Sequence, residues 1–231
     1  MARLPRLYAP GVVQRIVQRA GEGRLLFESA EDYRVLFEVL KEAAHSNELA
    51  IHAYVLLPRQ IQLLATPSNV SALPRTMQAI GRRYVPYMNR RTGRLGPLFD
   101  RRYRSTLIEA ERYLLACMRH LEMQPVSQGL AQSPDEWYWS SYRHHVGREQ
   151  EAFLADHPLY WSLRNTPFER QAAYRSLVEE PLEADAVSEI ERATETGWGL
   201  GSEFFLESIA THATRRVTPL PRGRPKKTQT S

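Results

Sequence analysis

Residues 49–66 decide the fold of this chain and read LAIHAYVLLPRQIQLLAT. The first half, Leu49–Leu57, is an apolar run with enough alternation to predict a β-strand. A break at Pro58 follows, and Gln60–Thr66 alternates again, so that its apolar side chains share one face. The stretch therefore predicts two adjacent strands that pair with each other.

The segments on either side complete an α+β pattern. Short strands are predicted at Gly11–Gln18 and Leu25–Phe27, separated by a basic turn that contains glycine. Helices are predicted from the N-cap Ser29 to about Ser46, at Ser71–Asn89 and at Glu109–Met123, with an arginine-rich loop at Arg90–Arg104. This order predicts a ferredoxin-like antiparallel sheet covered by helices.

The last third of the chain has a different pattern. Helical segments are predicted near Pro167–Glu179, Glu183–Thr194 and Ser202–Ala213, and a polar, basic tail begins at Thr214. We expect this tail to be disordered by itself. The sequence thus predicts a core at 1–147, a helical extension at 148–213 and a basic tail at 214–231.

The basic residues indicate a polyanionic partner. The 231-residue chain has a net charge of +5, and of its 31 lysines and arginines only Lys41, Lys226 and Lys227 are lysine. Arginine offers a planar pair of donors that matches phosphate or a guanine edge. A single cysteine, Cys117, excludes a disulfide framework and a multi-cysteine zinc site. Without a long apolar run or a signal-like N-terminus, we expect a cytoplasmic protein and no membrane partner.

Several segments resemble one known family. They are, in chain order, Ala53–Pro58, Gly96–Phe99, Arg102–Ser105, Tyr113–Cys117 with Pro125, Trp139–Tyr142 and Gly197–Glu203. Together they resemble the REP-associated tyrosine transposases, which are relatives of the HUH single-tyrosine transposases that cut and rejoin single-stranded DNA. The resemblance extends over nearly the whole chain and implies the α+β fold predicted above.

The resemblance implies a metal site that this chain has altered. Family members hold a divalent cation with two histidines, separated by one hydrophobic residue, on a central strand. Side chains two apart on a strand share a face, so both imidazoles reach one metal that polarises the phosphate. The matching positions here are Gln60 and Gln62, whose amide oxygens are weak substitutes. The nearby His52 is interpreted as a packed or hydrogen-bonded side chain rather than a ligand.

The family nucleophile is also replaced. The resemblance implies a tyrosine that forms a covalent phosphotyrosine link, and the corresponding position here is His120. Tyr113 and Tyr103 are weak stand-ins, and Tyr113 lies two turns, about 10 Å, before His120 on the same helix. We therefore assign no catalytic residue and expect no cofactor. Mg²⁺ or Mn²⁺ is expected only if a rearranged site is active.

An arginine-rich stretch predicts contacts with nucleic acid. Between positions 82 and 104 the predicted contacts are Arg82, Arg83, Arg90, Arg91, Arg94, Arg101, Arg102 and Arg104. Four aromatic residues are interleaved with them, namely Tyr84, Tyr87, Phe99 and Tyr103. Arginines neutralise phosphates while flat rings stack on unpaired bases. Arg15, Arg19 and Arg24 extend this predicted surface. The alternative is a solvated basic face whose tyrosines belong to the core.

Two further clusters bear on binding. The tail contains an AT-hook-like sequence, with Arg222, Arg224, Lys226 and Lys227 around Gly223 and Pro225, which predicts contact with an AT-rich minor groove. A plain electrostatic tail is the alternative. Four aromatic residues, Trp137, Tyr138, Trp139 and Tyr142, are predicted to pack against the end of the core rather than to stack on bases.

These features lead to one leading hypothesis and two alternatives. The leading hypothesis is a bacterial, nucleoid-associated DNA-binding protein of the transposase family that recognises single-stranded or hairpin DNA and has lost cleavage. The first alternative is an active metal-dependent transposase or nuclease with a rearranged site. The second is a module that interacts with RNA or with another protein.

Overall fold

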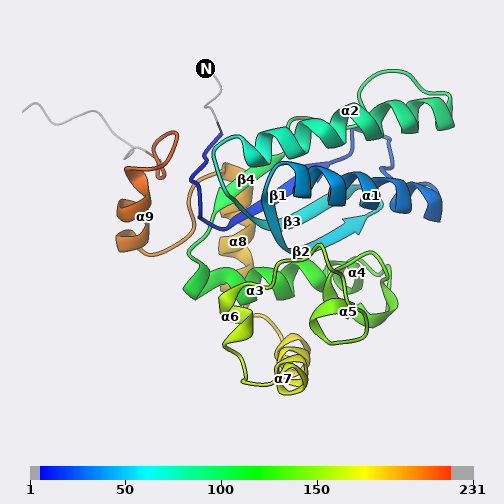
Figure 1. Ribbon diagram of the computed structural model, residues 1–231. Helices are drawn as coiled ribbons and strands as arrows, with labels where there is room; N and C mark the ends of the chain where they lie inside the picture. Colours follow the sequence, from blue (N-terminus) through cyan, green and yellow to red (C-terminus); the bar gives the residue numbers. More distant parts are fainter. Residues whose placement is uncertain (1–5, 220–231) are drawn as a thin grey trace, which may run out of the picture.

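The computed structural model describes residues 6–219 and contains one antiparallel sheet with the strand order β2-β3-β1-β4 (Figure 1). The strands are β1 (Gln14–Arg19), β2 (Leu49–Leu57), β3 (Gln60–Pro67) and β4 (Arg104–Leu107). Helices α1 (Ala30–Ser46) and α2 (Ala72–Thr92) connect them in the order β1-α1-β2-β3-α2-β4. This connectivity confirms the predicted ferredoxin-like α+β fold.

The remaining helices follow the sheet in sequence. They are α3 (Ala110–Glu122), α4 (Gln124–Ser127), the short 3-10 helix η1 (Pro134–Glu136), α5 (Tyr142–His145), α6 (Pro158–Trp161), α7 (Pro167–Glu179), α8 (Ala184–Thr196) and α9 (Glu203–Ala210). Figure 1 shows α1 and α2 on one side of the sheet and α3 on the other. Ser29 caps α1 as predicted. The Asp32 carboxylate in turn accepts a hydrogen bond from the Ser29 N–H, which completes a capping box.

Side-chain alternation gives the sheet two apolar faces. Ile61 and Leu63 of β3 pack with the α1 and α2 side chains, whereas Leu64 packs with α3. Gln60 and Gln62 therefore lie on the α3 face, because residues two apart on a strand point the same way. Across the antiparallel β1–β3 pairing, Gln60 is opposite Arg19 and Gln62 is opposite Val17. The register thus brings polar side chains from both central strands to one place.

One strand prediction was wrong, and one loop prediction was incomplete. Leu25–Phe27 is not a strand, although Leu26 and Phe27 are buried in the cluster under α1 and α2. Their apolar character reflects burial and not ladder pairing. In the stretch predicted as the loop Arg90–Arg104, α2 continues to Thr92, and β4 begins at Arg104 and pairs with β1.

Among the C-terminal helices, α8 contacts β1 and β4 of the sheet, whereas α7 packs on α5 and α6. Tyr174 of α7 and Ile190 of α8 belong to the same apolar cluster as Leu121 of α3. The prediction of a disordered tail from Thr214 was wrong at its start, because Val217 is buried and the Thr214 N–H donates to the Tyr8 carbonyl. Residues 220–231 lie outside the described part of the chain. Within the described part, no helix is both long and apolar enough to cross a membrane.

Candidate nucleic-acid interface

A polar pocket of about 200 Å³ lies on the α3 face of the sheet. It is lined by Arg15, Val17, Arg19, Gln60, Gln62, His120, Gln124, Glu191, Thr194 and Glu195. These residues come from β1, β3, α3, α8 and the start of α4. The positions that the family resemblance assigns to the metal ligands and to the nucleophile therefore meet in one pocket, which we call the glutamine pocket.

The centre of the glutamine pocket holds a buried guanidinium. Arg15 is 4% exposed. Its Nη2 donates to Gln62 Oε1 at 2.7 Å, and its Nη1 donates to Thr194 Oγ1 at 2.6 Å. Burial lowers the pKa of Arg15, yet arginine remains charged in proteins. The predicted contact between Arg15 and DNA is not supported, since its side chain is enclosed by the protein.

A divalent cation does not fit between the two glutamines. The Gln62 oxygen already accepts a hydrogen bond from the guanidinium, and a fixed positive charge at that distance repels a second cation. Neutral amide oxygens also bind transition metals more weakly than imidazole. The residues at these positions are thus suited to an arginine and not to a metal ion.

His120 is a neutral acceptor at the edge of the same pocket. Burial, with a further contribution from the charge of Arg15, lowers the pKa of His120 to about 4. Its Nε2 lies 3.2 Å from Gln124 Nε2 and 3.9 Å from Glu191 Oε1. The side chain is 7% exposed. An uncharged ring bonded to an amide N–H orients the pocket wall and offers no hydroxyl for a phosphotyrosine link.

Neither stand-in tyrosine has an activated hydroxyl. The Tyr103 hydroxyl lies 2.6 Å from that of Tyr8, and burial raises the pKa of Tyr103 well above its ordinary value. The Tyr113 hydroxyl donates to Glu189 Oε2 at 2.8 Å, and burial and this bond raise its pKa. Both environments disfavour the phenolate that attacks phosphorus. Tyr113 also lines neither the glutamine pocket nor the second pocket, which is described next.

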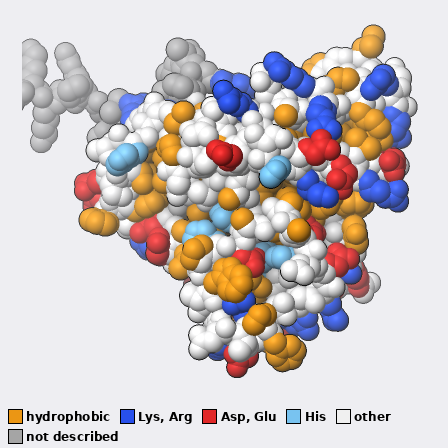
Figure 2. Space-filling model, in the orientation of Figure 1, with side chains coloured by type: hydrophobic (Ala, Val, Ile, Leu, Met, Phe, Trp, Pro, Cys, Tyr) orange, Lys and Arg blue, Asp and Glu red, His pale blue; other side chains and the backbone are white. Residues whose placement is uncertain are grey.

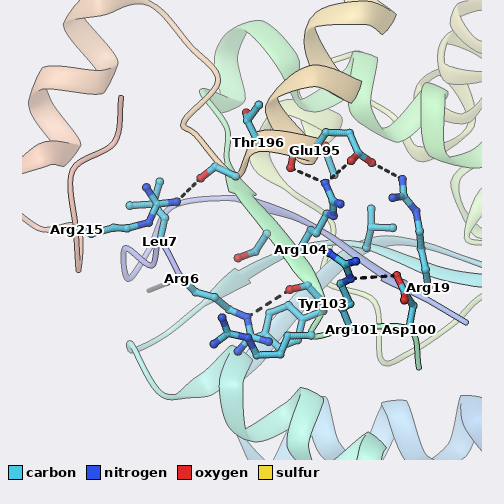
Figure 3. A pocket seen from close by; sticks show the side chains of 15 residues that line it. Arg6, Leu7, Arg19, Asp100, Arg101, Tyr103, Arg104, Glu195, Thr196 and Arg215 are labelled. Atoms are coloured by element: carbon cyan, nitrogen blue, oxygen red, sulfur yellow. Dashed lines mark hydrogen bonds and ion pairs between the residues drawn. The ribbon is translucent and has the colours of Figure 1, made fainter. Parts of the chain in front are cut away.

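A second pocket, of about 320 Å³, is lined by six arginines (Figure 3). They are Arg6, Arg19, Arg101, Arg102, Arg104 and Arg215. We call this the arginine pocket. It shares Val17, Arg19, Thr194 and Glu195 with the glutamine pocket, so the two are neighbours. Sequence reasoning identified four of these arginines but missed Arg6 and Arg215. The only signal for Arg215 was the Arg215-Arg216 doublet after the last predicted helix.

A carboxylate from the C-terminal extension lies in the arginine pocket. Glu195 accepts from Arg19 at 2.6 Å and also pairs with Arg104. Burial alone would raise the pKa of Glu195, but the bond to Arg19 and the charges of Arg19 and Arg104 outweigh it and lower the pKa. The three side chains remain well exposed to solvent. One anion is therefore held between two guanidiniums at an accessible position.

The remaining predicted arginines lie apart from this pocket. On and just after α2, Arg83 pairs with Glu42, Arg91 with Asp32 at 2.6 Å, and Arg94 with Glu28 at 3.6 Å. Arg82 and Arg90 form no ion pair with any residue between 6 and 219. Figure 2 shows basic side chains with acidic ones among them over the α1 and α2 side. The predicted surface is thus two separate regions, and each is partly neutralised, since in the arginine pocket Arg101 also lies 3.9 Å from Asp100.

The predicted stacking aromatics are mostly core residues. Tyr84 is fully buried and donates to the Leu26 carbonyl, and Tyr87 donates to Asp32 Oδ1 at 3.0 Å. The alternative of core tyrosines therefore holds on α2. Around residues 137–142, Trp139 stacks on Tyr33 and the Trp137 indole donates to the Leu56 carbonyl, which confirms packing there. Tyr138 is the exception, at 54% exposed.

His52 has a structural role. It lies at a bulge in β2, with Nδ1 2.6 Å from the Ala155 carbonyl and Nε2 2.8 Å from Thr66 Oγ1. Burial lowers its pKa to about 4, against the opposing effect of the Ala155 bond. Both ring nitrogens are thus engaged, and the interpretation of a hydrogen-bonded side chain is confirmed.

Comparison with known proteins shows the fold. No protein-family model matches the chain, and no curated protein matches its sequence. Among solved structures, a REP-associated tyrosine transposase bound to a REP hairpin matches 68% of this chain and 92% of its own, with a TM-score of 0.53 and 16% identity. A putative transposase from Deinococcus radiodurans matches 52% of this chain and 94% of its own, with a TM-score of 0.37 and 19% identity. The chain has the fold of the first, as the resemblance implied.

The two buried histidines predict that acid destabilises the protein. His52 and His120 have pKa values of about 4 when folded, and an unfolded histidine titrates near 6.5. The unfolded state therefore binds protons first, so this stability is present above pH 6.5 and is lost as the pH falls toward 4. We expect a loss of roughly 2 kcal/mol per histidine at pH 5, measured by urea unfolding.

The variant His120→Gln should flatten this pH dependence between pH 7 and pH 5. The exposed His212 provides the matched control, and His212→Gln should leave the pH dependence unchanged. An equal slope in the wild type and in His120→Gln would contradict the burial argument.

Proposed function

We propose that this chain binds single-stranded or hairpin DNA through the arginine pocket and its rim, and that it does not cleave the DNA. The observation that carries the proposal is the position of six arginines beside a pocket in which glutamines and a histidine take the family's catalytic positions. The transposase with the same fold is described as bound to a REP hairpin, which supports DNA as the partner class.

The chemistry of the arginine pocket suits a phosphodiester. Arg19 and Arg104 already converge on two oxygens of one carboxylate, and paired guanidiniums bind phosphate oxygens in the same way. Arg101 and Arg102 are exposed at the rim. A backbone of successive phosphates reaches several such side chains at once, and release of its counterions adds to the affinity.

The glutamine pocket supports binding without cleavage. Strand transfer needs a Lewis acid and an oxygen nucleophile. Here Arg15 holds the amide oxygen of Gln62, and His120 is neutral and has no hydroxyl. The guanidinium supplies the positive charge that favours a phosphate nearby, yet it cannot polarise the phosphorus as a bound metal ion does.

The tail is a separate part of the proposal. Arg222, Arg224, Lys226 and Lys227 lie outside the described residues, so the proposed contact with an AT-rich minor groove rests on their sequence. A minor-groove contact requires duplex DNA, which the stem of a hairpin provides next to unpaired bases.

A hairpin assay tests the central proposal. We expect the full chain to bind a DNA hairpin equally well with and without Mn²⁺, with neither nicking nor a covalent phosphotyrosine adduct. Competition with an RNA hairpin and with linear duplex at fixed salt measures selectivity. Metal-dependent nicking with an adduct would instead establish the active-enzyme alternative, and affinity indifferent to nucleic-acid structure would favour the general interaction module.

Removal of three pocket arginines should weaken binding and reduce its salt dependence. For Arg101→Ala, Arg102→Ala and Arg104→Ala combined, the slope of log K against log salt should fall by about 2, since each single-strand phosphate contact contributes about 0.7. Fluorescence anisotropy at several salt concentrations measures this. A triple variant of Arg82, Arg83 and Arg90 removes the same charge from α2. Equal losses in both variants would show a net-charge effect and not a pocket.

Neutralising Glu195 should strengthen binding. The carboxylate competes with phosphate for Arg19 and Arg104, so Glu195→Gln is expected to raise DNA affinity roughly two- to fivefold at low salt. The exposed Glu207 on α9 is the matched control, because Glu207→Gln changes the net charge equally without touching the arginine pocket. A gain of the same size in both variants would rule out competition at the pocket.

A further inference from the structure

We propose that His144, His145 and Asp156 form a binding site for a divalent transition-metal ion of the Zn²⁺ class, separate from the glutamine pocket. One ligand atom from each of these residues lies within 4.8 Å of the others. His144 and His145 end α5, and Asp156 precedes α6. Two imidazoles with one carboxylate form a donor set that suits such an ion.

His145 is already oriented as a ligand. Its side chain is 1% exposed, and its Nδ1 lies 2.7 Å from Glu122 Oε1. Glu122 is itself fully buried and also accepts hydrogen bonds from Ser141 and Tyr174. A carboxylate held in this way fixes the ring proton on Nδ1 and leaves the lone pair on Nε2. Metal-bound histidines commonly have this carboxylate–imidazole arrangement behind them.

The free side of the His145 ring faces a carboxylate. Nε2 is buried without a hydrogen-bond partner among the described residues, and it lies 4.0 Å from Asp156 Oδ1. The buried lone pair of His145 requires an electropositive partner, and the partly exposed Asp156 oxygen beside it can share one. A cation bound by both atoms satisfies this requirement.

His144 completes the set with one rearrangement. Its Nε2 lies 3.1 Å from Asp156 Oδ1, and its Nδ1 accepts from the Glu151 N–H. If His144 binds the ion through Nε2, its ring proton moves to Nδ1. Nδ1 can then no longer accept the hydrogen bond from the Glu151 N–H, which must be broken. Tetrahedral zinc places its ligand atoms about 3.3 Å apart. The two separations from Asp156 are 3.1 and 4.0 Å, and all three ligand atoms lie within 4.8 Å of one another, so the two imidazoles must draw together when the ion binds. His144 and Asp156 are partly exposed and give the ion a path from solvent.

The site would act as a structural link. It joins α5, at the end of the core, to Asp156 in the helical extension, and it lies on the other side of α3 from the glutamine pocket. Glu122, which holds His145, is two residues after His120, and this spacing turns the two side chains about 200° apart on the helix. A metal ion here therefore stabilises the packing of the extension and takes no part in the proposed DNA contact.

Calorimetric titration of the full chain with Zn²⁺ tests the site. We expect one ion per chain and a higher Tm in its presence. Asp156→Asn and His144→Gln should each weaken Zn²⁺ binding roughly tenfold or more. These two positions are preferred to the buried His145, because their partly exposed side chains allow the variants to fold. Co²⁺ should give the visible absorption of a tetrahedral site, and Asp156→Asn should abolish it.

His212→Gln removes an exposed histidine elsewhere and should leave Zn²⁺ affinity unchanged. The proposal is overturned by the lack of saturable one-to-one binding, by unaltered affinity in the Asp156 and His144 variants, or by an equal loss in His212→Gln. Hairpin binding by the same variants should remain normal, so a failure here is distinguishable from a failure of the proposed DNA-binding function.

Discussion

The buried guanidinium of Arg15 is the constraint on which the candidate site depends. A charge taken out of water is costly unless its donors are bonded, and the two bonds of this guanidinium come from Gln62 on β3 and Thr194 on α8, while its Nε has no partner among the described residues. One side chain thus couples the central strands to the C-terminal extension. Removing α8 would leave that charge without one of its partners, so the extension is part of the site and not only an addition to it. The same charge decides what the glutamine pocket accepts.

Much of the fold follows from the sequence because its signals are local. Apolar alternation in β2 and β3 and the Ser29 cap each act within a few residues, and the structure has them where they were predicted. The strand β4 follows an arginine-rich loop and has only four residues. Four residues are too few to show a periodic signal. The prediction of a strand at Leu25–Phe27 was wrong because a short apolar run indicates burial but does not indicate a strand to pair with.

The site was predictable only in part, because its contacts join distant segments. Strand spacing placed Gln60 and Gln62 on one face, and the helix position of His120 brought it to the same pocket. The bonds from α8 to Arg15 and Arg19 link residues more than 170 positions apart, and no pattern in the chain indicates them. The arginine run is divided between two regions for a related reason. On a helix, consecutive residues point about 100° apart, so Tyr84 faces the core while Arg83 reaches the acidic side chains of α1.

Two adjacent residues of α8 have opposite relations to solvent, and this separates anchoring from binding. Thr194 is buried and bonded to Arg15, whereas Glu195 is exposed and lies between Arg19 and Arg104. An exposed ion pair is weak, since water and salt screen it, so the Glu195 carboxylate can separate from Arg19 and Arg104 at small cost. The buried bond of Thr194 resists the same exchange, because breaking it leaves a desolvated charge. Ligand exchange at the arginine pocket therefore does not require α8 to leave the sheet. The extension therefore forms one wall of the arginine pocket, and under the proposed function DNA, with several phosphates, would replace Glu195 more readily than a single small anion would.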